Sequence, residues 1–216
     1  MTGTAGKALA EAISTFLFVF SIIGAINSKS PLTPLAIGLA LTVLVYAAGH
    51  ISGAHLNPAV SFGALIRGAI GVTDFVAYIV AQFVGGALAA LASFAVWPAA
   101  TKPATPEQFN VGAAFLVEAL FTLALVWVVL NVATSKDNDN NSFYGLAIGG
   151  TVFVGAVSVG GISGGGFNPA VALGLSISGQ FAWSNLWLYV VAPLVGAAIA
   201  AILFRVLSAG DKKAAA

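Results

Sequence analysis

Long apolar stretches separated by short polar ones dominate the chain. Each of the six long stretches is close to the ~20 residues that an α-helix needs to cross the hydrocarbon core of a bilayer. They cover residues 8–27, 33–50, 75–97, 111–133, 143–161 and 183–207. Polar residues, proline and charge occupy the breaks at 27–34, 98–110 and 135–142. The pattern predicts six transmembrane helices.

Two further apolar stretches, residues 57–67 and 168–178, are too short to cross a bilayer. Each follows a glycine-rich segment and begins with an Asn-Pro-Ala triplet, Asn57-Pro58-Ala59 in one case and Asn168-Pro169-Ala170 in the other. Asparagine is a favourable helix N-cap and proline suits the first helical turn. We therefore expect two re-entrant half-helices whose positive dipole ends point at a common site. A single triplet is equally compatible with an ordinary turn, but the doubled pattern predicts a pore.

The chain repeats itself at a fixed distance. The two triplets lie 111 residues apart, and so do the similar segments that contain Gln82 and Pro193. Each half holds three spans and one half-helix, and because three is odd the second half enters the membrane from the opposite face. The sequence therefore predicts inverted repeats, with the functional site near the midplane where they meet. We expect one domain over 1–216: repeat 1 at about 7–97, a loop at 98–110, repeat 2 at about 111–207 and a tail at 208–216.

Composition agrees with a membrane protein and excludes several other classes. The 216 residues are 59% hydrophobic and 7% charged, against about 25% charged in a soluble domain. A net charge of +1 gives no case for nucleic-acid binding. There is no cysteine and there are only two histidines, so the sequence offers neither a metal cluster nor a nucleophile–base pair. We expect the lipid bilayer as a partner, no cofactor, no metal and no enzymatic activity.

Lysine and arginine positions predict the orientation. With six spans both termini share one side of the membrane, and cationic residues are more frequent on the cytoplasmic side. Six of them fall on the side of the termini: Lys7, Arg67, Lys136, Arg205, Lys212 and Lys213. Lys29 and Lys102 fall on the other. This predicts cytoplasmic termini, and the short termini are compatible with a cell (plasma or bacterial inner) membrane.

These motifs together resemble one known family. The doubled triplet, the lead-in His50-Ile51-Ser52-Gly53-Ala54-His55-Leu56, and Glu11 and Glu118 inside apolar helices are similar to the aquaporin, or major intrinsic protein, family over about residues 7–207. The resemblance implies an all-α membrane protein with six tilted helices, two half-helices meeting at mid-membrane, one water-conducting pore per subunit and a homotetramer. The stretch from Asn168 to Ala172 is similar to plant tonoplast intrinsic proteins.

Two kinds of polar side chain are expected at the junction of the repeats. The amides of Asn57 and Asn168 donate into the lumen, so that a passing water turns its oxygen toward them and cannot relay a proton. Glu11 and Glu118 face the protein interior because a carboxylate in a bilayer is costly. The family resemblance gives these glutamates the role of braces that hold the loop backbone. A proton relay or an ion site is the alternative.

The remaining polar candidates are two histidines and a glutamine. For His50 we expect a position beside the pore or a contact that holds the loop, with a pH gate as the alternative. We expect His55 to form a hydrogen bond within the loop. Gln82 is expected to hold loop backbone, and direct contact with a solute is the alternative.

The chain departs from the family pattern at the outer constriction. Many members carry an arginine directly after the second triplet, where this chain has Val171. Alignment on the two triplets assigns the other three constriction positions to Ile37, Ala156 and Gly165; a one-residue slip would change Ile37 and Ala156 but neither of the other two. This set has no charge, no aromatic ring and no side-chain donor, and it predicts a wide apolar opening. Water, urea, ammonia and hydrogen peroxide are the expected neutral solutes, with glycerol a weaker candidate.

Other functions share some of these features. Inverted repeats with broken helices are also typical of secondary transporters, for which Glu11 and Glu118 would be the available carboxylates. A junctional membrane protein with a closed pore is a further alternative. The sequence favours a passive channel over both of them.

Overall fold

The computed structural model describes residues 3–97, 109–208, 210 and 211, and every regular element within them is helical. The elements are α1 (Thr4–Asn27), α2 (Thr33–Ser52), α3 (Pro58–Arg67), α4 (Val72–Ser93), α5 (Val111–Ala133), η1 (Lys136–Asn138), α6 (Tyr144–Ser163), α7 (Pro169–Ile177), η2 (Trp183–Asn185) and α8 (Leu186–Leu207). Six helices are long and apolar enough to span a membrane, which confirms the predicted fold class. Most of the expected loop 98–110 and tail 208–216 lies outside the described residues.

The elements are arranged as two copies of one unit. The helices α1 to α4 form the first unit and α5 to α8 the second, and α2 and α6 are each 20 residues long. Both of these helices end at a left-handed glycine, Gly53 with φ 89° and Gly164 with φ 92°. Glycine adopts this backbone region without steric cost, so the backbone turns sharply inward at the same point of each repeat.

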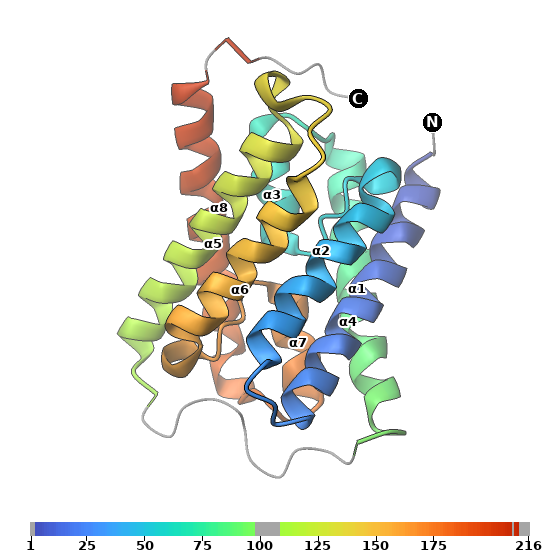
Figure 1. The fold of residues 1–216 in the computed structure, drawn as a ribbon, viewed down its shortest axis with the longest axis vertical. Coiled ribbons are helices and arrows are strands. Elements are labelled where there is room, and N and C mark those ends of the chain that lie inside the picture. The colour runs from blue at the N-terminus through green and yellow to red at the C-terminus, as the bar shows by residue number, and fades with distance from the viewer. Residues whose placement is uncertain (1–2, 98–108, 209, 212–216) are drawn as a thin grey trace.

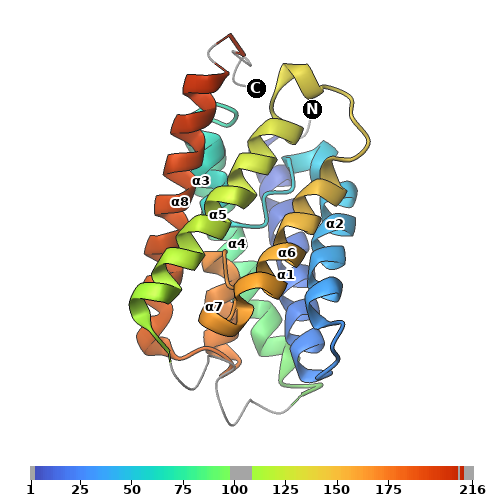
Figure 2. The ribbon, with the colours of Figure 1, turned by 60° about the vertical axis from the view of Figure 1, so that its left-hand side comes forward.

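The two half-helices approach the midplane from opposite faces. Both termini lie at one end of the molecule (Figure 1), which we call the near face, and the opposite end is the far face. The half-helix α3 occupies the near half and α7 the far half (Figure 2). Their N-terminal ends therefore meet inside the molecule, surrounded by the six long helices.

Close helix crossings rest on glycine in both repeats. A Cβ atom at Gly85 of α4 would collide with the carbonyl oxygen of Ala12 in α1, and one at Gly196 of α8 would collide with that of Ala119 in α5. Small residues of this kind let helix backbones approach closely in membranes. Large apolar side chains such as Leu120 of α5 instead remain on the outside of the bundle, where lipid would cover them.

Charged side chains pair at the near face. Lys7 of α1 contacts Asp74 of α4 at 2.9 Å. Arg67, at the end of α3, lies 3.4 Å from Asp211, which follows α8. A hydrogen bond from the Ser135 hydroxyl, reinforced by Arg67, lowers the pKa of Asp211 below its usual value. The segment after α8 is thus attached to both the first half-helix and the loop after α5.

We expect Gly149→Ala and Gly150→Ala to have opposite effects on stability. A Cβ at Gly149 would collide with the Thr42 hydroxyl and the Gly38 carbonyl oxygen of α2, whereas a Cβ at Gly150 meets nothing within 4 Å. Alanine is favoured over glycine in a helix by about 1 kcal/mol, so Gly150→Ala should retain or raise the melting temperature in detergent. Gly149→Ala should lower it. Equal melting temperatures would contradict the α2–α6 crossing described here.

Candidate functional site

Each half-helix begins at the asparagine of its triplet. The Asn57 Oδ1 accepts a hydrogen bond from the Ala59 N–H at 2.9 Å, and the Asn168 Oδ1 accepts one from the Ala170 N–H at 2.9 Å. Both asparagines have extended backbone and are followed by proline at the first helical position. The side-chain oxygen of each asparagine is thus used to cap its own helix, which leaves the amide nitrogen directed away from it.

The two amide nitrogens connect the repeats across the midplane. The Asn57 Nδ2 donates to the Phe167 carbonyl at 2.9 Å, and the Asn168 Nδ2 donates to the Leu56 carbonyl at 2.8 Å. A side-chain amide carries two N–H groups, so each asparagine keeps a second donor. Both asparagines line a single cavity between the repeats, and this second donor is available to a molecule inside it.

Two buried glutamates hold the backbone that leads into the half-helices. The carboxylate of Glu11 accepts from four donors: the Ser52 hydroxyl at 2.6 Å, the N–H groups of His55 at 2.9 Å and Leu56 at 2.7 Å, and the Gln82 Nε2 at 2.9 Å. Glu118 accepts from three: the Ser163 hydroxyl at 2.7 Å and the N–H groups of Gly166 at 2.9 Å and Phe167 at 2.6 Å. Both glutamates are fully buried. Their contacts are those of the expected braces, and neither glutamate lines the cavity.

This bracing determines which way the loop carbonyls point. The N–H groups of Gly165, Gly166 and Phe167 point toward the Ser163 hydroxyl and Glu118. In a planar trans peptide the preceding C=O points in the opposite direction, and no peptide bond in the described residues is cis. The carbonyls of residues 164–166 therefore face the cavity that these residues line.

The first repeat has the same geometry on the near side. The N–H groups of Ala54, His55 and Leu56 point toward the Ser52 hydroxyl and Glu11. The carbonyls of residues 53–55 are consequently turned toward the same cavity. The site thus offers two rows of hydrogen-bond acceptors with a pair of amide donors between them.

The structure places all four predicted constriction residues on the cavity wall. Ile37, Ala156, Gly165 and Val171 line the cavity on the far side of the two asparagines; we call this set the far ring. No Asp, Glu, Lys or Arg is among the cavity-lining residues in the described part of the chain. The cavity is therefore uncharged, and its far ring offers no side-chain hydrogen bond.

The two histidines have different positions. His55 lines the cavity, its Nδ1 lies 3.0 Å from the Ser61 Oγ, and Gln82 donates to the same oxygen at 2.9 Å. A hydrogen bond within the loop is expected for His55; the partner of its ring, Ser61, instead lies in α3. The expectation for His50 is not met, because its side chain is exposed on the outside of α2 and does not line the cavity. Its position in the helical turn directs it away from the lumen.

Sequence reasoning missed two pairs of supporting residues. Ser52 and Ser163 each donate to a brace glutamate, and Tyr78 and Tyr189 each donate to the backbone carbonyl of that serine. The members of both pairs lie 111 residues apart, the same distance as the two triplets. A search for identical residues at this spacing would have found them.

Replacing Glu118 with glutamine should damage the site, since a glutamine amide keeps one oxygen acceptor but turns its N–H groups toward a donor that needs an acceptor. Hydrogen bonds to a charged group contribute about 1.5–3 kcal/mol each, so we expect Glu118→Gln to lower the melting temperature and to abolish permeation in liposomes. Asp137→Asn, which removes an exposed carboxylate, is the matched control and should change neither. A Glu118→Gln protein with unchanged stability and permeability would show that the brace is dispensable.

Comparison with known proteins identifies the family. A sequence model described as "Major intrinsic protein" matches residues 2–204. The chain is 41% identical to "Glycerol uptake facilitator protein-like 6" of Lactiplantibacillus plantarum, with 95% of this chain and 99% of that one covered. It is 36% identical to "Probable aquaporin TIP3-2" of Arabidopsis thaliana, with 91% and 81% covered.

A solved structure agrees at the level of the fold. The aquaglyceroporin from Plasmodium falciparum superposes with a TM-score of 0.83 over 96% of this chain and 98% of that one, at 22% sequence identity. The two inverted repeats, the paired Asn-Pro-Ala half-helices and the family match lead to one conclusion: the chain is an integral, multi-pass membrane protein that belongs to the major intrinsic protein family of channels.

Proposed function

We propose that this channel conducts water and small neutral solutes passively and excludes ions. The observation that carries the proposal is the uncharged cavity, in which two rows of loop carbonyls lie on either side of two amide donors at the midplane. Acceptors along both halves replace the hydrogen bonds that water or urea loses on leaving bulk solvent. The amides of Asn57 and Asn168 orient each passing water oxygen toward themselves, which interrupts a proton-relaying file.

Ion exclusion follows from the half-helices and from desolvation. The N-terminal end of each half-helix carries a partial charge of roughly +0.5, and the two ends meet at the same point of the lumen. A cation that enters loses its hydration shell and meets this positive potential, and none of the described lining residues supplies a carboxylate to compensate it. Because the far ring has Val171 and no arginine, cation exclusion rests on the half-helices.

The composition of the far ring favours a broad range of neutral solutes. A ring of Ile37, Ala156, Gly165 and Val171 has no bulky aromatic side chain and no cation, so urea, ammonia and hydrogen peroxide are proposed to pass with water. Glycerol is a second candidate because a relative 41% identical to this chain is named a glycerol uptake facilitator-like protein. The ring alone gives glycerol less support, since it has no donor for the glycerol hydroxyl oxygens.

Orientation, location and assembly complete the proposal. In the described residues Lys7, Arg67, Lys136 and Arg205 lie at the near face and Lys29 at the far face. This distribution supports cytoplasmic termini by the excess of cationic residues on that side, in a cell (plasma or inner) membrane. We propose a homotetramer with one pore in each subunit, by analogy with the family.

Stopped-flow light scattering on proteoliposomes tests the proposed solute range. The wild-type protein should raise water and urea permeability above empty liposomes, with the weak temperature dependence of a pore. Val171→Arg should remove urea flux and spare part of the water flux, because a long cationic side chain would then narrow the far ring. Val171→Leu, which adds one carbon without charge, is the control and should reduce urea flux less. A wild-type protein that passes water but no urea would contradict the proposed breadth.

A further inference from the structure

The far ring has a counterpart on the other side of the asparagines. The repeats correspond at a spacing of 111 residues, as the bounds of α2 and α6 and of the two triplets show. Moving each far-ring position by this spacing gives a second set of four residues, which we call the near ring: Val45, Ala54, Val60 and Ile148. The inverted symmetry places this ring about as far from the midplane as the far ring, toward the near face.

The two rings differ in size at two of their four positions. Ile148 corresponds to Ile37, and Val60 corresponds to Val171, so these positions are unchanged. The near ring has Val45 where the far ring has Ala156, and Ala54 where the far ring has Gly165. It therefore carries two larger side chains and none that is smaller.

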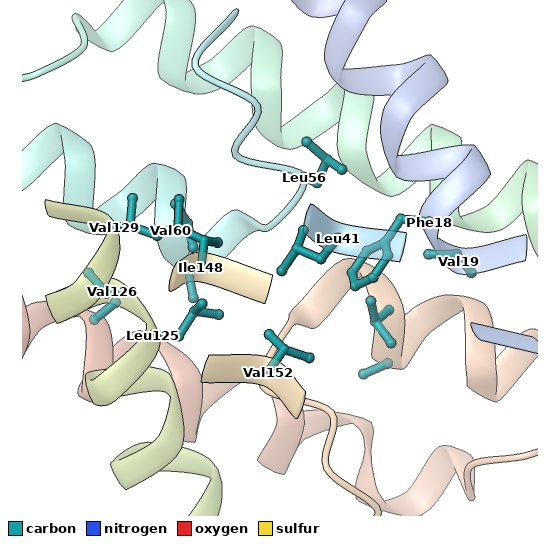
Figure 3. Packing of buried hydrophobic residues seen from close by; sticks show 14 of the residues in the cluster. Phe18, Val19, Leu41, Leu56, Val60, Leu125, Val126, Val129, Ile148 and Val152 are labelled. Atoms are coloured by element: carbon teal, nitrogen blue, oxygen red, sulfur yellow. The ribbon is translucent and has the colours of Figure 1, made fainter. Parts of the chain in front are cut away.

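The cavity wall carries this difference at Ala54 but not at Val45. Ala54, Val60 and Ile148 line the cavity, whereas Val45 is 1% exposed and is packed into the core. Figure 3 shows Val60 of α3 and Ile148 of α6 close to Val129 of α5, which also lines the cavity. Bulky side chains also line the far side, among them Ile22 of α1 and Phe181, so the two halves of the wall differ mainly at the loop positions.

Among the described residues, the cavity extends further beyond the far ring than beyond the near ring. On the far side it extends past the far ring to Thr33 and Gly160. Their counterparts on the near side, Tyr144 and Gly49, do not line it. A Cβ at Gly49 would lie 3.3 Å from the Tyr144 hydroxyl, so the tyrosine packs against α2 at this position.

We propose that the near ring, rather than the far ring, determines the largest solute that this channel passes. The inference rests on the proposed function as a passive pore. The far ring admits a neutral solute through an opening with one alanine and one glycine. On the near side the same solute meets the methyl group of Ala54 where the far ring has Gly165, and the His55 side chain where the second repeat has Gly166.

Reciprocal substitutions can test this: the backbone favours Ala54→Gly, whereas Gly165→Ala has space for its methyl group but strains a left-handed backbone position. Ala54 has a φ of 49° and Gly165 a φ of 69°, so both positions lie in the left-handed region. Ala54→Gly therefore places glycine where it is favoured. A Cβ at Gly165 would meet its nearest atom, in Phe167, at 3.5 Å, an ordinary van der Waals contact.

The experiment compares two double variants in proteoliposomes, with water, urea and glycerol as probes. Val45→Ala/Ala54→Gly gives the near ring the composition of the far ring, and Ala156→Val/Gly165→Ala does the reverse. The near-ring variant should raise the ratio of glycerol to water permeability by about tenfold, the discrimination that one methylene provides in an apolar pocket. The far-ring variant should leave this ratio within about twofold of wild type, because a ring of that size is already present. The single variant Ala54→Gly, which leaves Val45 and its packing unchanged, should move the ratio in the same direction as the near-ring double variant.

Three outcomes are distinguishable. An unchanged ratio in both near-ring variants, or a fall in the ratio caused by the far-ring variant, overturns the assignment of size selection to the near ring. The expected rise with the near-ring variants alone supports it. Wild-type liposomes no more permeable to water than empty ones would instead refute the proposed channel function on which the assignment rests.

Discussion

Satisfying backbone hydrogen bonds at the centre of a membrane is the constraint on which this structure depends. The segments 53–57 and 164–168 leave the helical state at a depth where lipid offers no hydrogen-bond partner, and each unsatisfied group there would cost several kcal/mol. Glu11 and Glu118 supply the acceptors for the loop N–H groups. Burial of a carboxylate is itself costly, and it is offset here because each one receives at least three hydrogen bonds.

The same constraint produces the chemistry of the pore. Because the N–H groups are turned outward toward the glutamates, the carbonyls are turned inward, and a channel wall forms without any polar side chain being added to it. The asparagines divide their hydrogen bonds in a similar way. Each one caps its own half-helix with oxygen and binds the other repeat with nitrogen. In each of these peptide groups the N–H supports the loop, and the C=O lines the solute path.

The repeats have nevertheless diverged in how they complete this arrangement. In the first repeat, Gln82 links Glu11 to Ser61 and through it to His55. The corresponding positions of the second repeat are Pro193, Ala172 and Gly166, which have no polar side chain. The near half therefore has a side-chain network beside the lumen, whereas the far half is lined mostly by backbone and apolar side chains. A few such substitutions are enough to give the two ends of a pore built from inverted repeats different side-chain chemistry.

Much of this could be predicted from the sequence, because both membrane spans and half-helices follow from chain length, hydrophobicity and Asn-Pro chemistry. The far-ring residues could be located because they lie at fixed distances from the triplets. His50 could not be placed, since α2 has few polar residues to indicate which side faces the lumen, and the structure puts this histidine outside. Ser52, Tyr78 and their counterparts were missed because hydroxyl groups in apolar helices carry no local signal. Only the comparison of the two repeats identifies them.

The most direct test of the central account is proton flux through the wild-type protein in liposomes loaded with a pH-sensitive dye, under an imposed membrane potential and alongside water permeability. The account attributes ion exclusion to the two half-helix ends and the paired amides, with no arginine in the far ring. It predicts fast water permeation with a proton flux equal to that of empty liposomes. Proton flux that rises in proportion to the amount of protein would contradict it, because the half-helices would then be insufficient to exclude charge.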